Sequence, residues 1–245
     1  LIMIEKNLIS SYIDNSKNIY YSILFIAPLF FLYELMCWMQ YANKIILIRN
    51  SADVFIQNII NEFMDNITPA ILLFIFLVFV IINRKKIANI HFKLNVLFIM
   101  FIESFVWTII FILVVASFNS LLLSIINDNI FFEQYYLAVG AGLWEELLFR
   151  VVLIMIFMYL TNKILRYSYF FSAFLSILIS SLLFSLFHYL GPFGDEFLYS
   201  TFYLRAFAGF FLGTLYLLRG YGIVVYTHVL YDFFVISNTV ISYKY

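Results

Sequence analysis

The chain has 245 residues, of which 65% are hydrophobic and only 11% are charged. A soluble domain carries about a quarter charged residues, so this composition excludes a water-soluble globule and indicates apolar surface that faces lipid. The formal net charge of zero argues against nucleic acid as a partner, because nucleic-acid binding needs a basic face. The single cysteine, Cys37, excludes an internal disulfide and a thiolate metal cluster.

The hydrophobic segments are long enough to cross a bilayer, for which a helix needs about 20 mostly apolar residues. In chain order, spans are expected at 19–41, 68–83, 95–117, 138–160, 168–191, 201–218 and 222–242. An eighth, short element would follow if the third span continues through 121–126. Backbone polar groups in lipid must be satisfied within their own segment. The sequence therefore predicts an all-α fold, a polytopic membrane bundle of seven or eight transmembrane helices, with residues 1–245 forming a single membrane domain.

The segments outside these spans add two expectations. Residues 51–68 place apolar side chains at roughly helical spacing among polar ones, which predicts an amphipathic helix on the membrane surface. The first 18 residues lack the apolar core and cleavage site of a signal peptide, so the first span is expected to act as an uncleaved signal. With the N-terminus inside, nine lysines and arginines fall in inner loops and three in outer loops, which favours that orientation.

Three short patterns place ionisable groups on three separate apolar spans. They are Glu145-Glu146-x-x-x-Arg150, Phe184-x-x-x-His188 and His228-x-x-x-Asp232. A charge in the bilayer core costs roughly 3 kcal/mol or more, so such residues are functional candidates by default. Together they supply the groups that move protons around an attacking water. The sequence therefore favours an enzyme inside a membrane.

The first pattern pairs two adjacent carboxylates with one arginine. On a helix Glu146 and Arg150 share a face and can form an ion pair. Glu145 points about 100° away, so it stays available as a base. The alternative interpretation is that the Glu146–Arg150 pair only holds two helices together.

The other two patterns contain the histidines. His188 lies one helical turn after Phe184, and it is either a site residue or an interfacial side chain near a helix end. His228 and Asp232 are also four residues apart, so the carboxylate can orient the imidazole or complete a polar pocket. A rise of about 1.5 Å per residue places His188 roughly 4 Å and His228 roughly 20 Å below the outer surface. Tilted or broken helices would have to bring the two histidines together.

Further polar and small residues lie within the spans. Glu34 and Glu103 lie mid-span and are expected to face the same cavity or to bond backbone elsewhere. Arg205 follows two acidic residues closely, which predicts a salt bridge at the outer rim. Gly209 and Gly213 form a face of small residues that permits close helix packing.

In this order on separate spans, the three motifs resemble the CPBP family of intramembrane proteases, also called the Abi or CAAX-protease-like family. The resemblance covers about residues 138–240, and it makes 138–242 a family-like catalytic core of four helices. Two positions depart from the usual family pattern: Val151 stands where Gly is common, and Asp232 where Asn is most frequent. Neither departure removes a candidate catalytic group.

The resemblance implies a glutamate-dependent endopeptidase. Glu145 would be the general base that activates water, and His188 would assist that activation or stabilise the oxyanion. His228 and Asp232 would complete the oxyanion pocket. Glu146 and Arg150 would hold the first motif helix in place.

The resemblance also implies partners and a location. Substrates would be membrane-associated proteins or peptides, such as CAAX-type tails, bacteriocin-type peptides or exported proteins, in a multi-pass protein of a prokaryotic cell membrane. No cofactor is expected, and a zinc ion held by Glu145, His188 and His228 is the less favoured alternative. Two other functions stay open: a non-proteolytic immunity or binding protein of the same fold, and a proton-coupled transporter.

Overall fold

The computed structural model describes residues 2–42, 49–63, 93–118, 131–191 and 194–242. These residues form helices and connecting loops, and no strand occurs among them. The helices are α1 (Ile2–Lys17), α2 (Ile19–Ala42), α3 (Ser51–Phe63), α5 (Leu94–Phe118), α6 (Phe131–Gly140), the π-helical η2 (Ala141–Leu153), α7 (Ile154–Met158), the π-helical η3 (Tyr159–Ile164), α8 (Tyr169–Phe187), α9 (Tyr199–Arg219) and α10 (Tyr221–Ser242). The expected all-α class is confirmed for this part of the chain.

Five helical segments are long and apolar enough to cross a membrane. They are Ile19–Gln40, Leu94–Ser117, Gln134–Ile164, Tyr169–Phe187 and Tyr199–Arg219, and the apolar helix Tyr221–Ser237 is shorter. The protein is therefore a multi-pass membrane protein. The expected count of seven or eight is not reached within the described ranges, and the elements expected at 68–83 and 121–126 lie outside them.

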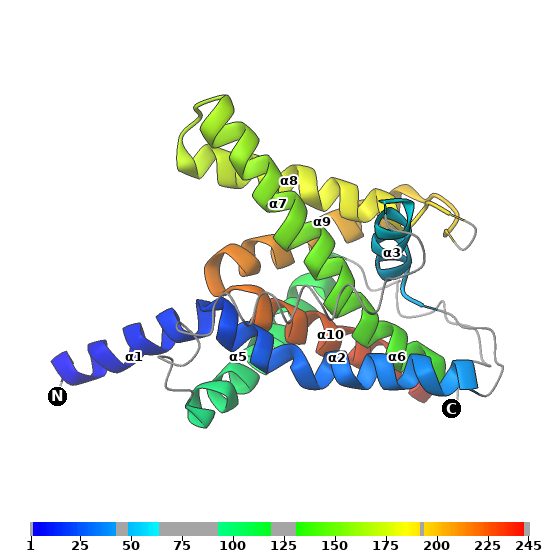
Figure 1. The fold of residues 1–245 in the computed structure, drawn as a ribbon, viewed down its shortest axis with the longest axis horizontal. Helices are drawn as coiled ribbons and strands as arrows, with labels where there is room; N and C mark the ends of the chain where they lie inside the picture. The colour runs from blue at the N-terminus through cyan, green and yellow to red at the C-terminus, as the bar shows by residue number, and fades with distance from the viewer. Residues whose placement is uncertain (1, 43–48, 64–92, 119–130, 192–193, 243–245) are drawn as a thin grey trace.

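Two expected spans have different ends in the structure. The span expected at 138–160 belongs to a continuous helical run from Phe131 to Ile164, which crosses the bundle diagonally (Figure 1). The span expected at 168–191 ends at Phe187, because the backbone turns before Gly191, whose φ is +85°. His188 therefore lies at the end of α8, in the C-cap position.

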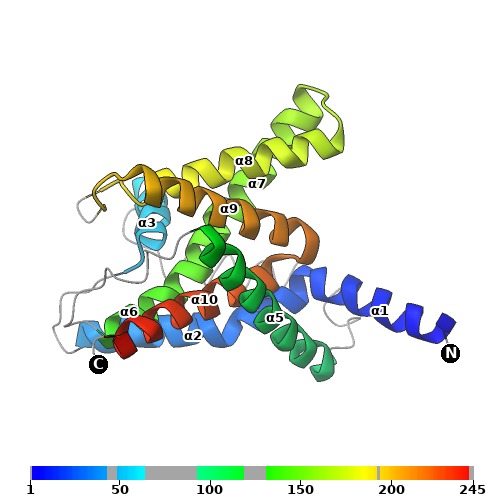
Figure 2. The ribbon, with the colours of Figure 1, turned by 180° about the vertical axis from the view of Figure 1, so that it is seen from behind.

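The helix α10 forms the centre of the molecule. It packs against α2, α5, α6, α9 and η2, and Ile223, Val224 and Val225 have no exposed surface. Figure 2 shows α10 between α2 and α5, with the α8–α9 pair crossing above them. This arrangement brings the C-terminal motif against the middle of the diagonal helix.

Small residues set the two helix contacts that matter for the site. A Cβ atom on Gly209 would lie 3.0 Å from the Phe184 ring and 3.1 Å from the Ser181 backbone, so glycine lets α9 approach α8 closely. A Cβ on Gly142 would lie 3.0 Å from the carbonyl oxygen of Val225, which explains the equally close contact of η2 with α10.

The amphipathic helix predicted for 51–68 is present over 51–63 as α3, which is docked on the bundle, and residues 64–68 lie outside the described ranges. It packs against η2 and lies crosswise to α2 and α8 (Figure 1). Ala52 and Asp53 are fully buried, while Val54, Phe55 and Ile59 remain exposed. The side chain of Asp53 therefore points into the protein, where it pairs with Arg49.

The two mid-span glutamates do not meet in one cavity. Glu34 forms an ion pair with Arg49, which also pairs with Asp53. Glu103 forms one with Arg219 at the far end of α9. Each carboxylate is thus neutralised by its own arginine.

The Glu103–Arg219 pair belongs to a network that ties α1 to the bundle. Arg219 also donates to Ser16 Oγ at 2.9 Å, and Tyr12 donates its hydroxyl to Glu103. Trp107 donates its indole N–H to Glu103 Oε1 at 3.1 Å. The network joins α1, α5 and α9.

Candidate active site

The π-helical segment η2 carries the first motif and buries all of its ionisable groups. Glu145, Glu146 and Arg150 are 7%, 0% and 1% exposed. Arg150 Nε lies 3.0 Å from Glu146 Oε2, as the i,i+4 spacing predicts. π-Helical turns are rare and occur frequently at functional sites, where they re-aim side chains.

The arginine contacts an aromatic ring as well as a carboxylate. Its guanidinium carbon lies 4.3 Å from the centre of the Phe184 ring on α8, a cation–π contact. Its two terminal nitrogens have no hydrogen-bond partner among the described residues. Ser180 strengthens the same helix contact by donating to the carbonyl oxygen of Phe149 at 2.6 Å. The pair Glu146–Arg150 thus faces α8.

The third motif meets the first through Glu146. His228 Nδ1 lies 2.7 Å from Glu146 Oε1, and His228 is 6% exposed. Since a carboxylate accepts, Nδ1 carries the proton. Asp232 Oδ2 is 3.6 Å from His228 Nε2, beyond hydrogen-bond length. Glu146 is therefore the carboxylate that bonds His228, whereas the sequence offered Asp232 either for this role or to complete a polar pocket.

The second motif places His188 beside the same group. Its Nδ1 lies 2.9 Å from the carbonyl oxygen of Phe184. A carbonyl can only accept, so Nδ1 holds the proton, and Nε2 of the neutral ring is an acceptor. The Phe184 ring lies between the two histidines, 4.9 Å from the His188 ring and 6.3 Å from the His228 ring, centre to centre. The two histidines are therefore neighbours, although straight spans placed them at different depths.

The adjacent carboxylate, Glu145, is outside the Glu146–Arg150 pair. Its Oε1 accepts a hydrogen bond from Asn50 Nδ2 at 2.9 Å. Glu145 directly precedes Glu146, which bonds His228 at 2.7 Å, so both carboxylates lie where η2 contacts α10. One carboxylate is thus held by an arginine and an imidazole, and the other by a neutral amide.

Asn50 is the site residue that sequence reasoning missed. It lies 95 positions before Glu145, just ahead of α3. An asparagine before an apolar run is a helix N-cap signal, and Asn50 does cap α3, since Oδ1 accepts from Ala52 N at 2.9 Å. No sequence signal, however, relates such a cap to a distant glutamate.

A charged cluster adjoins Asn50 in the loop between α2 and α3. Arg49 there contacts the carboxylates of Asp53 and Glu34 and lies 5.4 Å from the centre of the Tyr33 ring. Burial alone would lower the pKa of Arg49, but the two carboxylates outweigh it and raise the pKa above its usual value. Arg49 therefore stays charged.

The described residues do not assemble a metal site. No group of three or more His, Cys, Asp or Glu side chains among them has a geometry that could hold a metal ion. Glu145, His188 and His228 are therefore not arranged as zinc ligands among the described residues, and the expectation of no cofactor stays a prediction.

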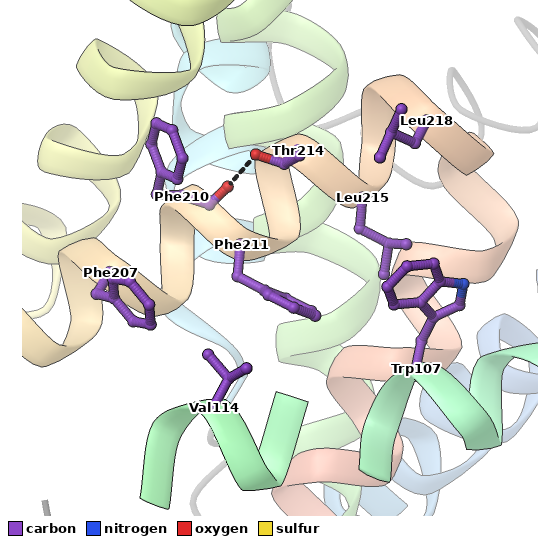
Figure 3. A pocket seen from close by; sticks show the side chains of 8 residues that line it. All are labelled: Trp107, Val114, Phe207, Phe210, Phe211, Thr214, Leu215 and Leu218. Atoms are coloured by element: carbon purple, nitrogen blue, oxygen red, sulfur yellow. Dashed lines mark hydrogen bonds between the residues drawn. The ribbon is translucent and has the colours of Figure 1, made fainter. Parts of the chain in front are cut away.

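The pocket between α5 and α9 is separate from this group. It has a volume of about 350 Å³ and is lined by Trp107, Val114, Phe207, Phe210, Phe211, Thr214, Leu215 and Leu218 (Figure 3). Thr214 donates its hydroxyl to the Phe210 carbonyl oxygen at 2.8 Å, so even its polar lining is internally satisfied. No motif residue lines it.

The described part of the chain is a multi-pass helical membrane protein with a buried group of carboxylates and imidazoles, and one comparison with known families gave a match. Residues 127–234 match the family model described as Type II CAAX prenyl endopeptidase Rce1-like. The match contains all three motifs, so residues 127–234 are similar to this family of CPBP-type proteases, and the resemblance seen in the sequence is confirmed over these residues. Neither a curated protein nor a solved structure gave a significant match.

Proposed function

We propose that this protein is an intramembrane endopeptidase in which Glu145 activates water. The observation that carries the proposal is that Glu145 is buried next to the Glu146–His228 bond and lies outside the Glu146–Arg150 pair. A general base needs a carboxylate that is not held in an ion pair, and of the two adjacent glutamates only Glu145 forms no ion pair with Arg150 among the described residues.

The proton transfers follow from these positions. Glu145 takes a proton from water as the water oxygen attacks the scissile carbonyl carbon, and the carbonyl oxygen becomes an oxyanion. The protonated carboxyl then gives that proton to the leaving amine nitrogen as the C–N bond breaks, which restores Glu145. Water is thus divided between the new carboxyl terminus and the new amine.

The two histidines and Asp232 assist this step, one histidine at the attacking water and the other at the oxyanion. His188 Nε2, an acceptor when Nδ1 bonds the Phe184 carbonyl, can hold the attacking water by accepting its second hydrogen. His228, with Nδ1 held by Glu146, would donate from a protonated Nε2 to the oxyanion, and Asp232 lies beside that nitrogen. Glu146 and Arg150 are positioning residues in this scheme.

The family description supports the substrate class. CAAX-type prenylated tails are the first candidates because the matched family model is described as a CAAX prenyl endopeptidase. Bacteriocin-type and exported peptides are the other substrates to assay. The proposal includes membrane lipid and a protein or peptide substrate as partners, a prokaryotic cell membrane as location, and activity without a metal cofactor.

Cleavage by the purified protein tests the proposal. The protein is reconstituted in lipid vesicles with a quenched fluorescent peptide that ends in a farnesylated CAAX sequence, with and without a chelator. We expect cleavage that survives the chelator and is lost in Glu145→Gln. A wild-type rate no higher than that of folded Glu145→Gln, across the three substrate types, would exclude the protease and leave the binding or transport alternatives.

A further inference from the structure

Asn50 lies outside the family-matched segment, yet its side chain is fixed between α3 and Glu145. Oδ1 accepts from Ala52 N at 2.9 Å, and Nδ2 donates to Glu145 Oε1 at 2.9 Å. A backbone N–H can only donate, so it must face the oxygen of the amide. This contact settles the orientation of the amide and directs its N–H₂ group at the glutamate.

The backbone of Asn50 is fixed as firmly as its side chain. Its N–H donates to Tyr33 Oη at 3.1 Å, and its carbonyl accepts from Val54 N at 3.0 Å. Tyr33 donates in turn to Asp53 Oδ2 at 2.8 Å, and both of these side chains are fully buried. Capping α3 accounts for the bonds to Oδ1 and to the carbonyl oxygen, so the bond to Tyr33 holds Asn50 more rigidly than a cap needs.

Both carboxylates of the network are paired with Arg49, so it adds rigidity without placing an unpaired charge beside Glu145. Arg49 pairs with Asp53 and Glu34, and Gln57 Nε2 donates to Asp53 Oδ1 at 2.7 Å. The group that finally contacts Glu145 is an uncharged amide. A neutral donor fixes a carboxylate oxygen without forming the ion pair that would hold the second carboxylate inert.

We propose that Asn50 is a positioning residue for Glu145, supplied by a part of the chain outside the family-matched domain. Donation from Nδ2 occupies Oε1 and fixes the plane of the carboxylate, so Oε2 is the oxygen that receives the proton of water. The inference rests on the proposed function, in which Glu145 is the general base. It assigns the α2–α3 junction a part in the reaction.

The sharpest perturbation is Asn50→Asp. Aspartate caps a helix as well as asparagine does and has nearly the same shape, but it places an oxygen where Glu145 now receives a donor. Asn18 is the matched control because it caps α2 with the same two bonds. Its Oδ1 accepts from Tyr20 N at 2.9 Å and its carbonyl from Ser22 N at 3.0 Å. None of its described bonds reaches Glu145.

The first readout is thermal unfolding of the full chain, which needs no substrate. We expect Asn50→Asp to lower the melting temperature by roughly 5 °C or more, because two carboxylates then face each other in a buried site. In a Glu145→Gln background the loss should largely disappear, since the glutamine amide donates to the new aspartate. Asn18→Asp should have the same small effect in both backgrounds. An equal loss for Asn50→Asp in both backgrounds overturns the contact.

The second readout is the kinetics of cleavage of the farnesylated peptide. Asn50→Ser keeps a capping hydroxyl that is too short to reach Glu145, so it serves where Asn50→Asp folds poorly. We expect kcat to fall at least about tenfold with KM within about twofold, because the base is misplaced while the substrate site is intact. A wild-type kcat in folded Asn50→Ser overturns the positioning role. If the wild-type protein cleaves nothing, the proposed function fails alone, and the thermal cycle still decides whether Asn50 holds Glu145.

Discussion

Replacing Glu146 by Gln tests whether the buried pair holds the site together. The carboxylate has no exposed surface and contacts Arg150 at 3.0 Å and His228 at 2.7 Å. Removing one partner of a buried ion pair costs about 3–5 kcal/mol, since it leaves an uncompensated charge. Glutamine keeps one oxygen acceptor, so the lower end of this range is expected.

The magnitude converts into a measurable shift. At roughly 2–4 °C per kcal/mol for a chain of this size, Glu146→Gln should lower the melting temperature by roughly 6–12 °C. Cys37 makes the assay simple because it is the single cysteine and only 2% exposed. A dye that fluoresces on reaction with thiols therefore reports unfolding of the α2 region in detergent through the chain's own cysteine.

The adjacent glutamate is the control for this prediction. Glu145 bonds a neutral amide, so Glu145→Gln should melt within about 2 °C of the wild-type protein. The reasoning is refuted if Glu146→Gln is as stable as the wild type, or if Glu145→Gln is the more destabilised of the two. The second outcome would mean that Glu145 carries the structural charge and that the two carboxylates have exchanged parts.

Three further predictions concern the base, the helix contact and the α1 network. Glu145→Gln should reduce kcat about 10²–10⁴-fold while the protein stays folded, measured with the quenched peptide; near-wild-type cleavage would exclude it as the base. Gly209→Ala should cost about 1–3 kcal/mol in thermal unfolding, because the added methyl meets the Ser181 backbone at 3.1 Å; an unchanged melting temperature would show that α8 and α9 can move apart without loss. Arg219→Gln should free α1 for protease cleavage, because Arg219 contacts Glu103 and Ser16. Arg205→Gln breaks only the exposed pair with Asp195, which is worth at most about 1 kcal/mol, and is the control. Equal protease resistance in the two variants would contradict the role of Arg219 in holding α1.

Contacts between residues close together in the sequence were predictable from spacing, and contacts between distant helices were not. The Glu146–Arg150 pair follows from a separation of four residues, and so does the salt bridge of Arg205 from its nearness to Asp195. The Glu146–His228 bond joins residues 82 positions apart, and it forms only because η2 packs against α10 in this orientation. Hydrophobic periodicity contains no information about that meeting.

The helix ends and the π-helical turns were also beyond the sequence. An apolar run shows where a helix is allowed, but the end of α8 at Phe187 depends on the turn that follows it. Likewise, the segment 51–68 has the amphipathic pattern of a surface helix, yet Asp53 of α3 is buried in the protein, where it pairs with Arg49. Polar side chains on a helix can bond either water or a buried partner, and tertiary packing determines which.

The pairing of Arg150 with a glutamate in its own helix has a consequence for biosynthesis. A nascent segment that leaves the ribosome with both charges can neutralise them locally, before any other part of the site exists. The 82 residues that separate Glu146 from His228 take roughly 4–16 s to synthesise at about 5–20 residues per second. During that interval η2 can enter the bilayer with Arg150 already paired to Glu146. His228 is synthesised later and then bonds a carboxylate that is already in position.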